Sequence, residues 1–193
     1  MRVISGKFKG RKILSPPDYL ALRPTTDMIK ESIFNIIRFK IGGSVFLDLY
    51  AGSGAMAIEA ISEGANFAVL VENNPSAIRV IRKNIEMFSI RGETTIIKED
   101  ALTFLKNPYS LDSTTPNRFD IIFLDPPYTS GLSIKSLELL ANFPSLADSA
   151  IVIVEHTVKE SLKDNYGKLL KFEEKTHGKI ALTYFINEMT NKG

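Results

Sequence analysis

A short run near the middle of the chain combines an acid, two prolines and an aromatic ring. The run is Asp125-Pro126-Pro127-Tyr128, and it directly follows the expected strand 120–124. Successive prolines fix the backbone and carry no N–H, so neighbouring carbonyls are open to a ligand's donors. A nucleobase amino group is a poor nucleophile, because its lone pair is drawn into the ring. A carboxylate and a carbonyl that accept its two N–H groups would hold it toward a methyl donor, and Tyr128 offers a face for stacking a flipped-out base.

A second motif, Asp48-Leu49-Tyr50-Ala51-Gly52-Ser53-Gly54-Ala55-Met56-Ala57, lies between an apolar run and a helical pattern. Gly52 and Gly54 allow the backbone to turn tightly and to approach a ligand, and Ala57 suits the small position where a helix packs on a strand. Glu72 ends the next apolar run, where a carboxylate can accept both ribose hydroxyls of an adenosine. Ligands of open α/β sheets bind at the carboxyl ends of strands, so both features predict one adenosine-containing ligand.

The acids around this motif favour S-adenosylmethionine over a dinucleotide. Asp48 precedes the glycines, where its charge suits the ammonium of a methionine moiety and would repel a pyrophosphate. Asp100 follows the third apolar run and is placed to accept the adenine amino group. The same side chain is also placed to cap the next short helix, and it can serve both roles.

These motifs lie within an alternating pattern of strands and helices. Apolar runs predict strands at 44–49, 67–71, 94–97, 119–124 and 150–154. Helical periodicity predicts helices at 55–62, 76–88, 101–105 and 133–142, and an earlier helix that opens at Asp27 after a Thr cap. Near-continuous apolar strands joined by helices predict an α/β fold with a mostly parallel, doubly wound, Rossmann-like sheet. Two further runs, 168–175 and 179–187, predict a closing antiparallel hairpin.

Composition excludes several classes of chemistry. The 193 residues are 44% hydrophobic and 24% charged, which is typical of one globular domain. The longest uninterrupted apolar runs have five residues, so we expect no membrane span, and the N-terminus lacks the apolar stretch of a signal peptide. The absence of Cys removes disulfides, Cys-ligated metals and thiolate nucleophiles, and two His make a metal site unexpected. We therefore expect a cytoplasmic protein without a metal.

Positive charge gathers at the N-terminus. Residues 1–40 hold nine Lys and Arg against three acids, a net of +6, whereas residues 41–193 hold 15 against 19, a net of −4. The first twelve residues carry no acid, and their basic residues are Arg2, Lys7, Lys9, Arg11 and Lys12. Short extended runs around a glycine-flanked turn predict a small hairpin, joined to the body through Ser15-Pro16-Pro17. We expect this hairpin to contact a polyanion, the alternative being a solvated basic turn.

Taken in order along nearly the whole chain, these features resemble the RsmD family. The resemblance rests on 2–6, 9–13, 22–27, 31–35, both motifs, Glu72, Asp100-Ala101 and Val154-Glu155-His156. Asp-Pro-Pro-Tyr is shared with many amino-methylating enzymes of DNA, RNA and protein, whereas the Arg23-Pro24-Thr25-Thr26-Asp27 block and the basic hairpin are far more family-specific. The family methylates the exocyclic N2 of a guanine in bacterial 16S ribosomal RNA, with S-adenosyl-L-methionine as the donor.

The resemblance implies a set of site residues. The cofactor site would comprise Asp48, Tyr50, Ala51, Gly52, Ser53, Gly54, Glu72, Asn73, Asp100 and Ala101, with Arg23 and Thr25 near the methionine end. Asp125, Pro126, Pro127 and Tyr128 would hold the guanine. Asn73 departs from the family, in which an acid is more usual at this position. The implied partner is ribosomal RNA within a small-subunit assembly, and the basic hairpin residues would contact its phosphates.

Other functions fit parts of the sequence. An adenine-N6 or cytosine-N4 methyltransferase of DNA usually needs a target-recognition region, for which 193 residues leave little room. A non-catalytic RNA-binding module of the same fold has no need of both motifs, and a nicotinamide oxidoreductase leaves 125–128 unexplained. For the leading interpretation we expect residues 1–22 to form the RNA-contacting hairpin and residues 23–193 to form the methyltransferase domain.

Overall fold

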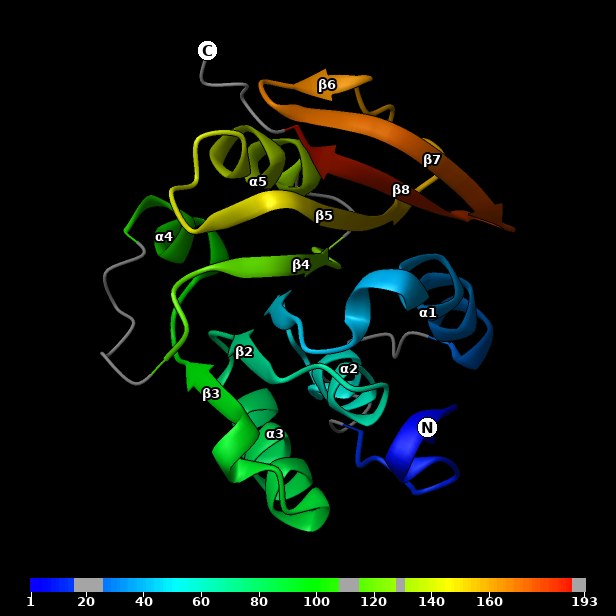
Figure 1. Cartoon of the computed structure of the whole chain (residues 1–193), viewed down its shortest axis with the longest axis vertical. Coiled ribbons are helices and arrows are strands. Elements are labelled where there is room, and N and C mark those ends of the chain that lie inside the picture. Colours follow the sequence, from blue (N-terminus) through cyan, green and yellow to red (C-terminus); the bar gives the residue numbers. More distant parts are fainter. Residues whose placement is uncertain (16–25, 108–114, 128–130, 189–193) are drawn as a thin grey trace.

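One eight-stranded sheet organises the chain. The computed structural model describes residues 1–15, 26–107, 115–127 and 131–188. Its helices are α1 (Asp27–Ile41), α2 (Ala55–Ser62), α3 (Pro75–Phe88), α4 (Ala101–Lys106) and α5 (Leu132–Leu140), with 3₁₀ turns at Gly6–Phe8 and Arg91–Glu93. Its strands are β1 (Val45–Leu49), β2 (Phe67–Val71), β3 (Thr94–Ile97), β4 (Phe119–Leu124), β5 (Leu146–Thr157), β6 (Asn165–Tyr166), β7 (Leu169–His177) and β8 (Ile180–Asn187). Figure 1 shows this arrangement.

The strand order is β3-β2-β1-β4-β5-β8-β7-β6. The five strands from β3 to β5 are parallel to their neighbours, whereas β8 joins β5 antiparallel and is followed by the antiparallel β7 and β6. The chain moves from β1 to β2 on one side and later returns to place β4 on the other side. The topological switch point therefore lies at the carboxyl ends of β1 and β4, where open α/β sheets bind ligands.

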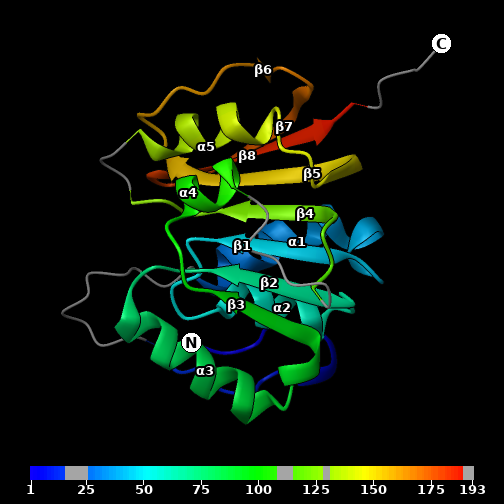
Figure 2. The same ribbon diagram turned by 90° about the vertical axis from the view of Figure 1, so that its left-hand side faces the viewer.

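Helices cover both faces of the sheet. In Figure 2, α4 and α5 lie in front of the sheet, and α1 and α2 lie behind it. One apolar core joins α1, α2 and α3 to the rear face, and a second joins α4 and α5 to the front face. Alternate residues of β1, β4 and β5 enter the two cores, which explains why these strands read as continuous apolar runs.

Local signals position the helices that frame the switch point. Thr26 caps α1, where its hydroxyl accepts a hydrogen bond from the N–H of Ile29 at 3.4 Å. Asn74 caps α3, with Pro75 at the first helical position, and its side chain accepts from Ser76 and Ala77. These caps fix where α1 and α3 begin. The sequence therefore predicts their starts to within one residue.

The expected fold class is confirmed, and the differences are local. β5 extends beyond 150–154 at both ends: Leu146 pairs with Phe119 of β4, and the residues after Val154 pair with β8. The short β6 has no counterpart in the expected elements. Within 1–15, the expected hairpin is reduced to one antiparallel bridge, Arg2 with Lys12, around a 3₁₀ turn. The expected boundary between residues 22 and 23 lies outside the described residues.

The N-terminal segment, residues 1–15, is attached to the body by buried contacts. Val3 and Ile13 are almost completely buried in the core beneath α1 and α2. The carboxylate of Glu59 in α2 accepts hydrogen bonds from the backbone N–H groups of Ile4 and Ser5 at 2.9 and 3.0 Å. Figure 1 shows the segment beside α2 and α3. One face of the segment is therefore part of the main core.

No helix in the described part of the chain has both the length and the apolar character needed to cross a bilayer.

Candidate active site

The loop after β1 has an unusual backbone. Tyr50, Gly52 and Gly54 have φ angles of 66°, 55° and 75°, in the left-handed region. The left-handed φ of Gly54 favours glycine, and a Cβ there would also come within 2.9 Å of the Leu70 side chain. Tyr50 is held in this conformation with its hydroxyl 3.0 Å from the hydroxyl of Ser136 in α5. Every second residue from Tyr50 to Gly54 has a left-handed φ, and the loop turns tightly enough for α2 to begin directly after it. Tight loops of this kind can approach a ligand closely.

Glu72 is fixed across from this loop at the end of β2. Its carboxylate accepts hydrogen bonds from the N–H of Gly52 at 2.9 Å and from the N–H of Asn74 at 2.7 Å. The side chain is only 8% exposed. Each carboxylate oxygen has more than one lone-pair position, so both can also accept from ligand hydroxyls. The expected ribose acceptor is therefore held by the glycine loop itself.

A hollow opens beside Glu72 at the carboxyl ends of β2 and β3. Its lining residues are Tyr50, Val71, Glu72, Asn73, Glu99, Asp100 and Ala101. Asp100 caps α4, because its Oδ1 accepts from the N–H groups of Leu102 and Thr103 at 3.0 and 3.1 Å. The expected cap is thus present, and the second oxygen of Asp100 is in none of these bonds.

Glu99 is a lining residue that the sequence gives no reason to select. Its Oε2 is buried and accepts no hydrogen bond from any described residue. A buried acceptor without a partner costs about 1–3 kcal/mol, which a ligand donor can offset. The hollow therefore presents an unused acceptor in addition to Glu72, which suits the polar edge of an adenosine.

Asp48 is the most deeply buried acid of the site. It is 1% exposed, and its Oδ2 has no hydrogen-bond partner among the described residues. Burial raises the pKa of Asp48 to about 8; a backbone hydrogen bond from Ala57 opposes the rise, and the charge of Glu72 adds to it. A cation at this position would restore the ionised form. A positively charged ligand group is therefore the kind of partner that the buried Asp48 carboxyl lacks in the described part of the chain.

The Asp125-Pro126-Pro127 segment lies on the neighbouring strand. It directly follows Leu124, the last residue of β4, which pairs with Leu49 of β1. Burial raises the pKa of Asp125 well above its ordinary value, and the charges of Glu155 and Asp48 raise it further. Of the expected nucleobase site, Asp125, Pro126 and Pro127 are thus brought beside the glycine loop. Tyr128 lies outside the described residues.

A buried amide links the glycine loop to the N-terminal segment. Asn84 of α3 is 0% exposed, and its Nδ2 donates to the carbonyls of Ser53 at 2.9 Å and Leu14 at 3.0 Å. Its Oδ1 accepts from the N–H of Leu14 at 2.9 Å. In the sequence, Asn84 is recognisable only as one polar residue on the apolar face of α3. That pattern does not predict Ser53 or Leu14 as its hydrogen-bond partners.

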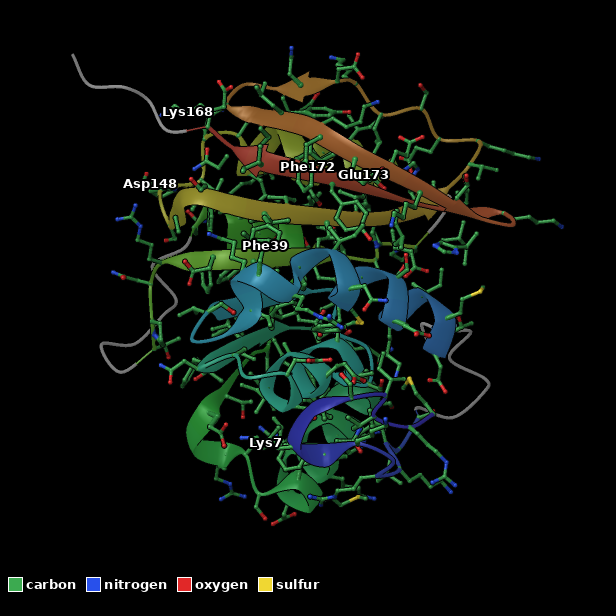
Figure 3. The ribbon with its side chains drawn as sticks, turned by 45° about the vertical axis from the view of Figure 1, so that its right-hand side comes forward. Lys7, Phe39, Asp148, Lys168, Phe172 and Glu173 are labelled. Carbon is green, nitrogen blue, oxygen red and sulfur yellow. The ribbon has the colours of Figure 1, made fainter. Side chains whose placement is uncertain are left out.

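Most of the basic N-terminal residues already have partners. Lys7, seen on the N-terminal segment in Figure 3, forms an ion pair with Glu93 at 2.8 Å. Arg11 lies over the rings of Phe8 and Phe88 and donates to the carbonyl of Met87. Arg2 donates to the carbonyl of Gly10 at 2.9 Å. Lys9 and Lys12 form no ion pair within the described part of the chain.

Comparison with known proteins places this geometry in a family. The family model described as Conserved hypothetical protein 95, that of the RsmD family, matches residues 1–186. The chain belongs to the RsmD family. It is 34% identical over 188 residues to Ribosomal RNA small subunit methyltransferase D of Escherichia coli (strain K12), covering 97% of this chain and 90% of that protein.

Other relatives and a solved structure are similarly close. A protein of the same name from Buchnera aphidicola subsp. Acyrthosiphon pisum is 38% identical over 160 residues, which are 83% of this chain and 80% of that protein. The solved structure of the Escherichia coli protein yhhF superposes with a TM-score of 0.83 at 29% identity, covering 97% and 98% of the two chains. The Rossmann-like methyltransferase fold is therefore shared along nearly the whole chain.

The RsmD-like positions fall into two groups in this structure. Those at the carboxyl edge are brought together around the switch point; they are Asp48, Tyr50, Ala51, Gly52, Ser53, Gly54, Glu72, Asn73, Asp100, Ala101, Asp125, Pro126 and Pro127. Arg23 and Thr25, expected near the methionine end of the cofactor, lie outside the described residues. The described residues also contain no group of three or more His, Cys, Asp or Glu side chains arranged to hold a metal.

Proposed function

We propose that this protein transfers a methyl group from S-adenosyl-L-methionine to the exocyclic N2 of a guanine in small-subunit (16S) ribosomal RNA. One observation carries the proposal: the glycine loop after β1 and Asp125-Pro126-Pro127 after β4 adjoin at the switch point of the sheet. A donor site and an amino-group site on neighbouring strands are what such a transfer needs. Membership of the RsmD family and the names of its relatives support ribosomal RNA as the substrate.

The described residues fit the proposed cofactor. Glu72 would accept the ribose hydroxyls, and Asp48, with its buried and unpartnered oxygen, would attract the ammonium group. Asp100 and Glu99 offer acceptors to the adenine side of the hollow. When bound, S-adenosylmethionine supplies an electrophilic methyl group attached to a positively charged sulfur. The role of the protein is to hold that group against the amino nitrogen and to exclude water.

The acceptor side of the site depends on Asp125 and the carbonyl of Pro126. Each would accept one N–H of the amino group, so that the nitrogen lone pair turns away from the guanine ring and toward the methyl group. Asp125 must be ionised to accept such a bond most strongly. Tyr128 is expected to stack on the extruded base.

The RNA contact is proposed for the exposed side of the N-terminal segment. Lys9 and Lys12 are exposed and are free of ion pairs with other described residues, so their charges are open to phosphates. Arg2, Lys7 and Arg11 could contact phosphate only in addition to, or in exchange for, their present partners. The segment is fixed to α2 and α3, so the lysines have a set position relative to the site.

The deciding experiment uses purified protein, methyl-labelled S-adenosylmethionine and small-subunit ribosomal particles that lack the modification. Nucleoside analysis of the product should show N2-methylguanosine as the labelled species. Labelled N6-methyladenosine or N4-methylcytidine would contradict the proposal and favour another amino-methyltransferase. Tight RNA binding without any transfer would favour a non-catalytic module. The Asp125→Ala protein serves as the control, because it keeps the fold and the cofactor residues.

A further inference from the structure

The outward side of α3 carries a row of basic side chains, which we call the α3 stripe. It consists of Arg79, Arg82 and Lys83, and all three side chains are exposed. Arg82 and Lys83 follow Arg79 by three and four residues, a spacing that makes them neighbours on a helix surface. Arg79 also donates a hydrogen bond to the hydroxyl of Ser76 at 2.6 Å, which leaves its charge uncompensated. The inward side of α3 packs in the core, so the helix presents these cations from a fixed position.

The α3 stripe forms no ion pair within the described part of the chain. The two acids at the end of α3 and in the following 3₁₀ turn are already paired with other cations. Glu86 lies 3.7 Å from the guanidinium of Arg91, and Glu93 lies 2.8 Å from the ammonium of Lys7. The three charges of the stripe are therefore open to an anionic partner, in the same way as the charges of Lys9 and Lys12.

Positive charge is concentrated at this end of the molecule. Residues 1–15 and 73–93 hold nine basic and two acidic residues, whereas the rest of the chain holds 15 basic and 20 acidic residues. Figure 2 shows α3 along the β3 edge of the sheet, at the opposite end from β6 and β7. The N-terminal segment adjoins α3, because the side-chain amide of Asn84 bonds to both backbone groups of Leu14. The α3 stripe and the N-terminal segment therefore belong to one basic side of the protein.

We propose that the α3 stripe is a second RNA-binding surface, which continues the surface of Lys9 and Lys12 toward the carboxyl edge of the sheet. The inference rests on the proposed function. α3 begins three residues after Glu72, so its first turn lies at the edge that holds the proposed cofactor site. The N-terminal segment contacts the other half of the helix, at Asn84. A helix of 14 residues is about 20 Å long, which gives the RNA backbone a path between the two regions.

Phosphate groups are the ligands that fit the α3 stripe best. Arg and Lys bind phosphate oxygens in any sequence, and the guanidinium group can donate two parallel hydrogen bonds to one phosphate. The centre of an interface between two proteins is depleted of charged residues and is more apolar. On the exposed side of α3 the structure describes one large exposed hydrophobic residue, Met87, in the last turn. The stripe would therefore add affinity and orient the RNA, without selecting the base.

The test measures filter binding of small-subunit ribosomal RNA at increasing salt, without cofactor. The variant with Arg79→Ala, Arg82→Ala and Lys83→Ala should flatten the slope of log affinity against log salt by about 2.1–2.7 units, because each phosphate contact contributes about 0.7–0.9. Its melting temperature and its affinity for S-adenosylmethionine should stay unchanged, since the three side chains are exposed and Ala is a good helix former. In methylation of ribosomal particles, its KM for RNA should rise while kcat stays the same.

Two further variants serve as controls. The variant with Lys168→Ala, Lys175→Ala and Lys179→Ala removes the same charge from exposed lysines of β7 and of the turns at its two ends, at the opposite end of the sheet (Figure 3 labels Lys168). It should keep the slope of the wild type. The variant with Arg79→Lys and Arg82→Lys keeps the charge of the α3 stripe and should also keep that slope.

The outcomes separate the α3 stripe from the proposed function. An unchanged slope in the alanine variant of the stripe would overturn the proposal, because the helix face would then be only solvated. Equal flattening in the β7 variant would also overturn it, because net charge alone would then attract the RNA. If the wild type bound RNA through the stripe but transferred no methyl group, the proposed function would be wrong and the surface would stand. Methyl transfer by the wild type with no effect of the stripe would contradict the surface alone.

Discussion

The side-chain amide of Asn84 donates a hydrogen bond to the carbonyl of Ser53 at 2.9 Å, across 31 residues of sequence. The same NH₂ group donates to the carbonyl of Leu14, and the amide oxygen accepts from the N–H of Leu14. One buried residue thus fixes the middle of the glycine loop and the end of the N-terminal segment. The hydrogen bonds of Asn84 therefore hold both the loop of the proposed cofactor site and the proposed RNA-binding segment.

Asn84→Ala should therefore weaken both stability and cofactor binding. It leaves the Ser53 carbonyl and both backbone groups of Leu14 without their partner, and each buried group left unsatisfied costs about 1–3 kcal/mol. We expect the free energy of unfolding to fall by roughly that amount or more, and S-adenosylmethionine affinity to fall in calorimetry. Lys83→Ala, on the exposed side of the same helix, should change stability by no more than about 0.5 kcal/mol. If the two variants had the same stability and the same S-adenosylmethionine affinity, Asn84 would not support the glycine loop.

Glu72→Ala should weaken S-adenosylmethionine binding by about 1.5–3 kcal/mol, the range of hydrogen bonds to a charged group. The loss combines the ribose contacts with a looser glycine loop, since Glu72 also holds the N–H of Gly52. Isothermal titration calorimetry measures the affinity directly. Glu86→Ala, an exposed acid of α3, is the control and should bind normally. An unchanged affinity in the Glu72 variant would rule out the ribose role, and tighter binding of NAD than of S-adenosylmethionine would favour an oxidoreductase.

Asp48 predicts proton release on cofactor binding. With a pKa of about 8, Asp48 is mostly protonated in the free protein at pH 6.5, and a bound ammonium would favour its ionised form. Binding should release up to about one proton, measured by calorimetry in two buffers of different ionisation enthalpy. Asp48→Asn should bind more weakly and release none. If both proteins released the same number of protons, the ammonium would lie elsewhere.

The same group makes stability depend on pH. Asp48 has a pKa near 3.8 when unperturbed and about 8 in the fold, so the folded chain holds a proton that the unfolded chain releases between these values. Its contribution favours folding at low pH and is lost as pH rises toward 8. Asp48→Asn should remove this part of the pH dependence, which denaturant titrations at pH 5 and pH 8 would detect.

Much of the site could be predicted from the sequence, because most of its residues lie within a few positions of the end of a strand. Glu72 directly follows β2, and Gly52 and Gly54 lie in the loop after β1, so the parallel order of these strands places them at one edge. The positive φ of Tyr50 could not be predicted, because a non-glycine residue adopts it only under the constraint of its surroundings. The buried oxygen of Glu99 likewise depends on how the end of β3 packs.

The unpredicted parts of the fold depend on distant segments. Asn84 is a polar residue on an apolar helix face, and its partners lie 70 and 31 residues away. The N-terminal segment reads as a separate basic hairpin, yet Val3 and Ile13 enter the main core, where Glu59 also reaches its backbone. β5 extends past the expected strand because β8 pairs with its far end. Single-sequence patterns carry no information on such pairings.

A variant of Asp125 should affect the rate of methyl transfer without affecting the binding of S-adenosylmethionine. Asp125→Ala should lower the single-turnover rate by about two to three orders of magnitude, the effect of losing one well-placed polar group. S-adenosylmethionine affinity should barely change, since the proposed contacts of Asp125 are with the base. Rapid-quench measurement of labelled RNA gives the rate, and calorimetry gives the affinity. A rate close to that of the wild type would mean that the carbonyl of Pro126 positions the amino group alone, or that the transfer occurs elsewhere.

The basic N-terminal residues give the last prediction, because four of the five form two pairs with different surroundings. Lys9 and Lys12 are exposed and have no acidic partner among the described residues, whereas Lys7 pairs with Glu93 and Arg11 lies on Phe8 and Phe88. Each phosphate contact contributes about 0.7–0.9 to the slope of log affinity against log salt. The variant with both Lys9→Ala and Lys12→Ala should therefore flatten the slope by about 1.4–1.8 units while its melting temperature stays unchanged.

The variant with Lys7→Ala and Arg11→Ala has the same change in charge and serves as the matched comparison. Its melting temperature should fall, because it removes an ion pair and the contact of Arg11 with two aromatic rings, and its salt slope should change less. Filter binding of small-subunit ribosomal RNA from about 50 to 200 mM salt measures both slopes. Equal flattening in the two variants would mean that general charge attracts the RNA. No flattening in either would show that the segment only supports the fold, because its buried face already gives it that role through Val3 and Ile13.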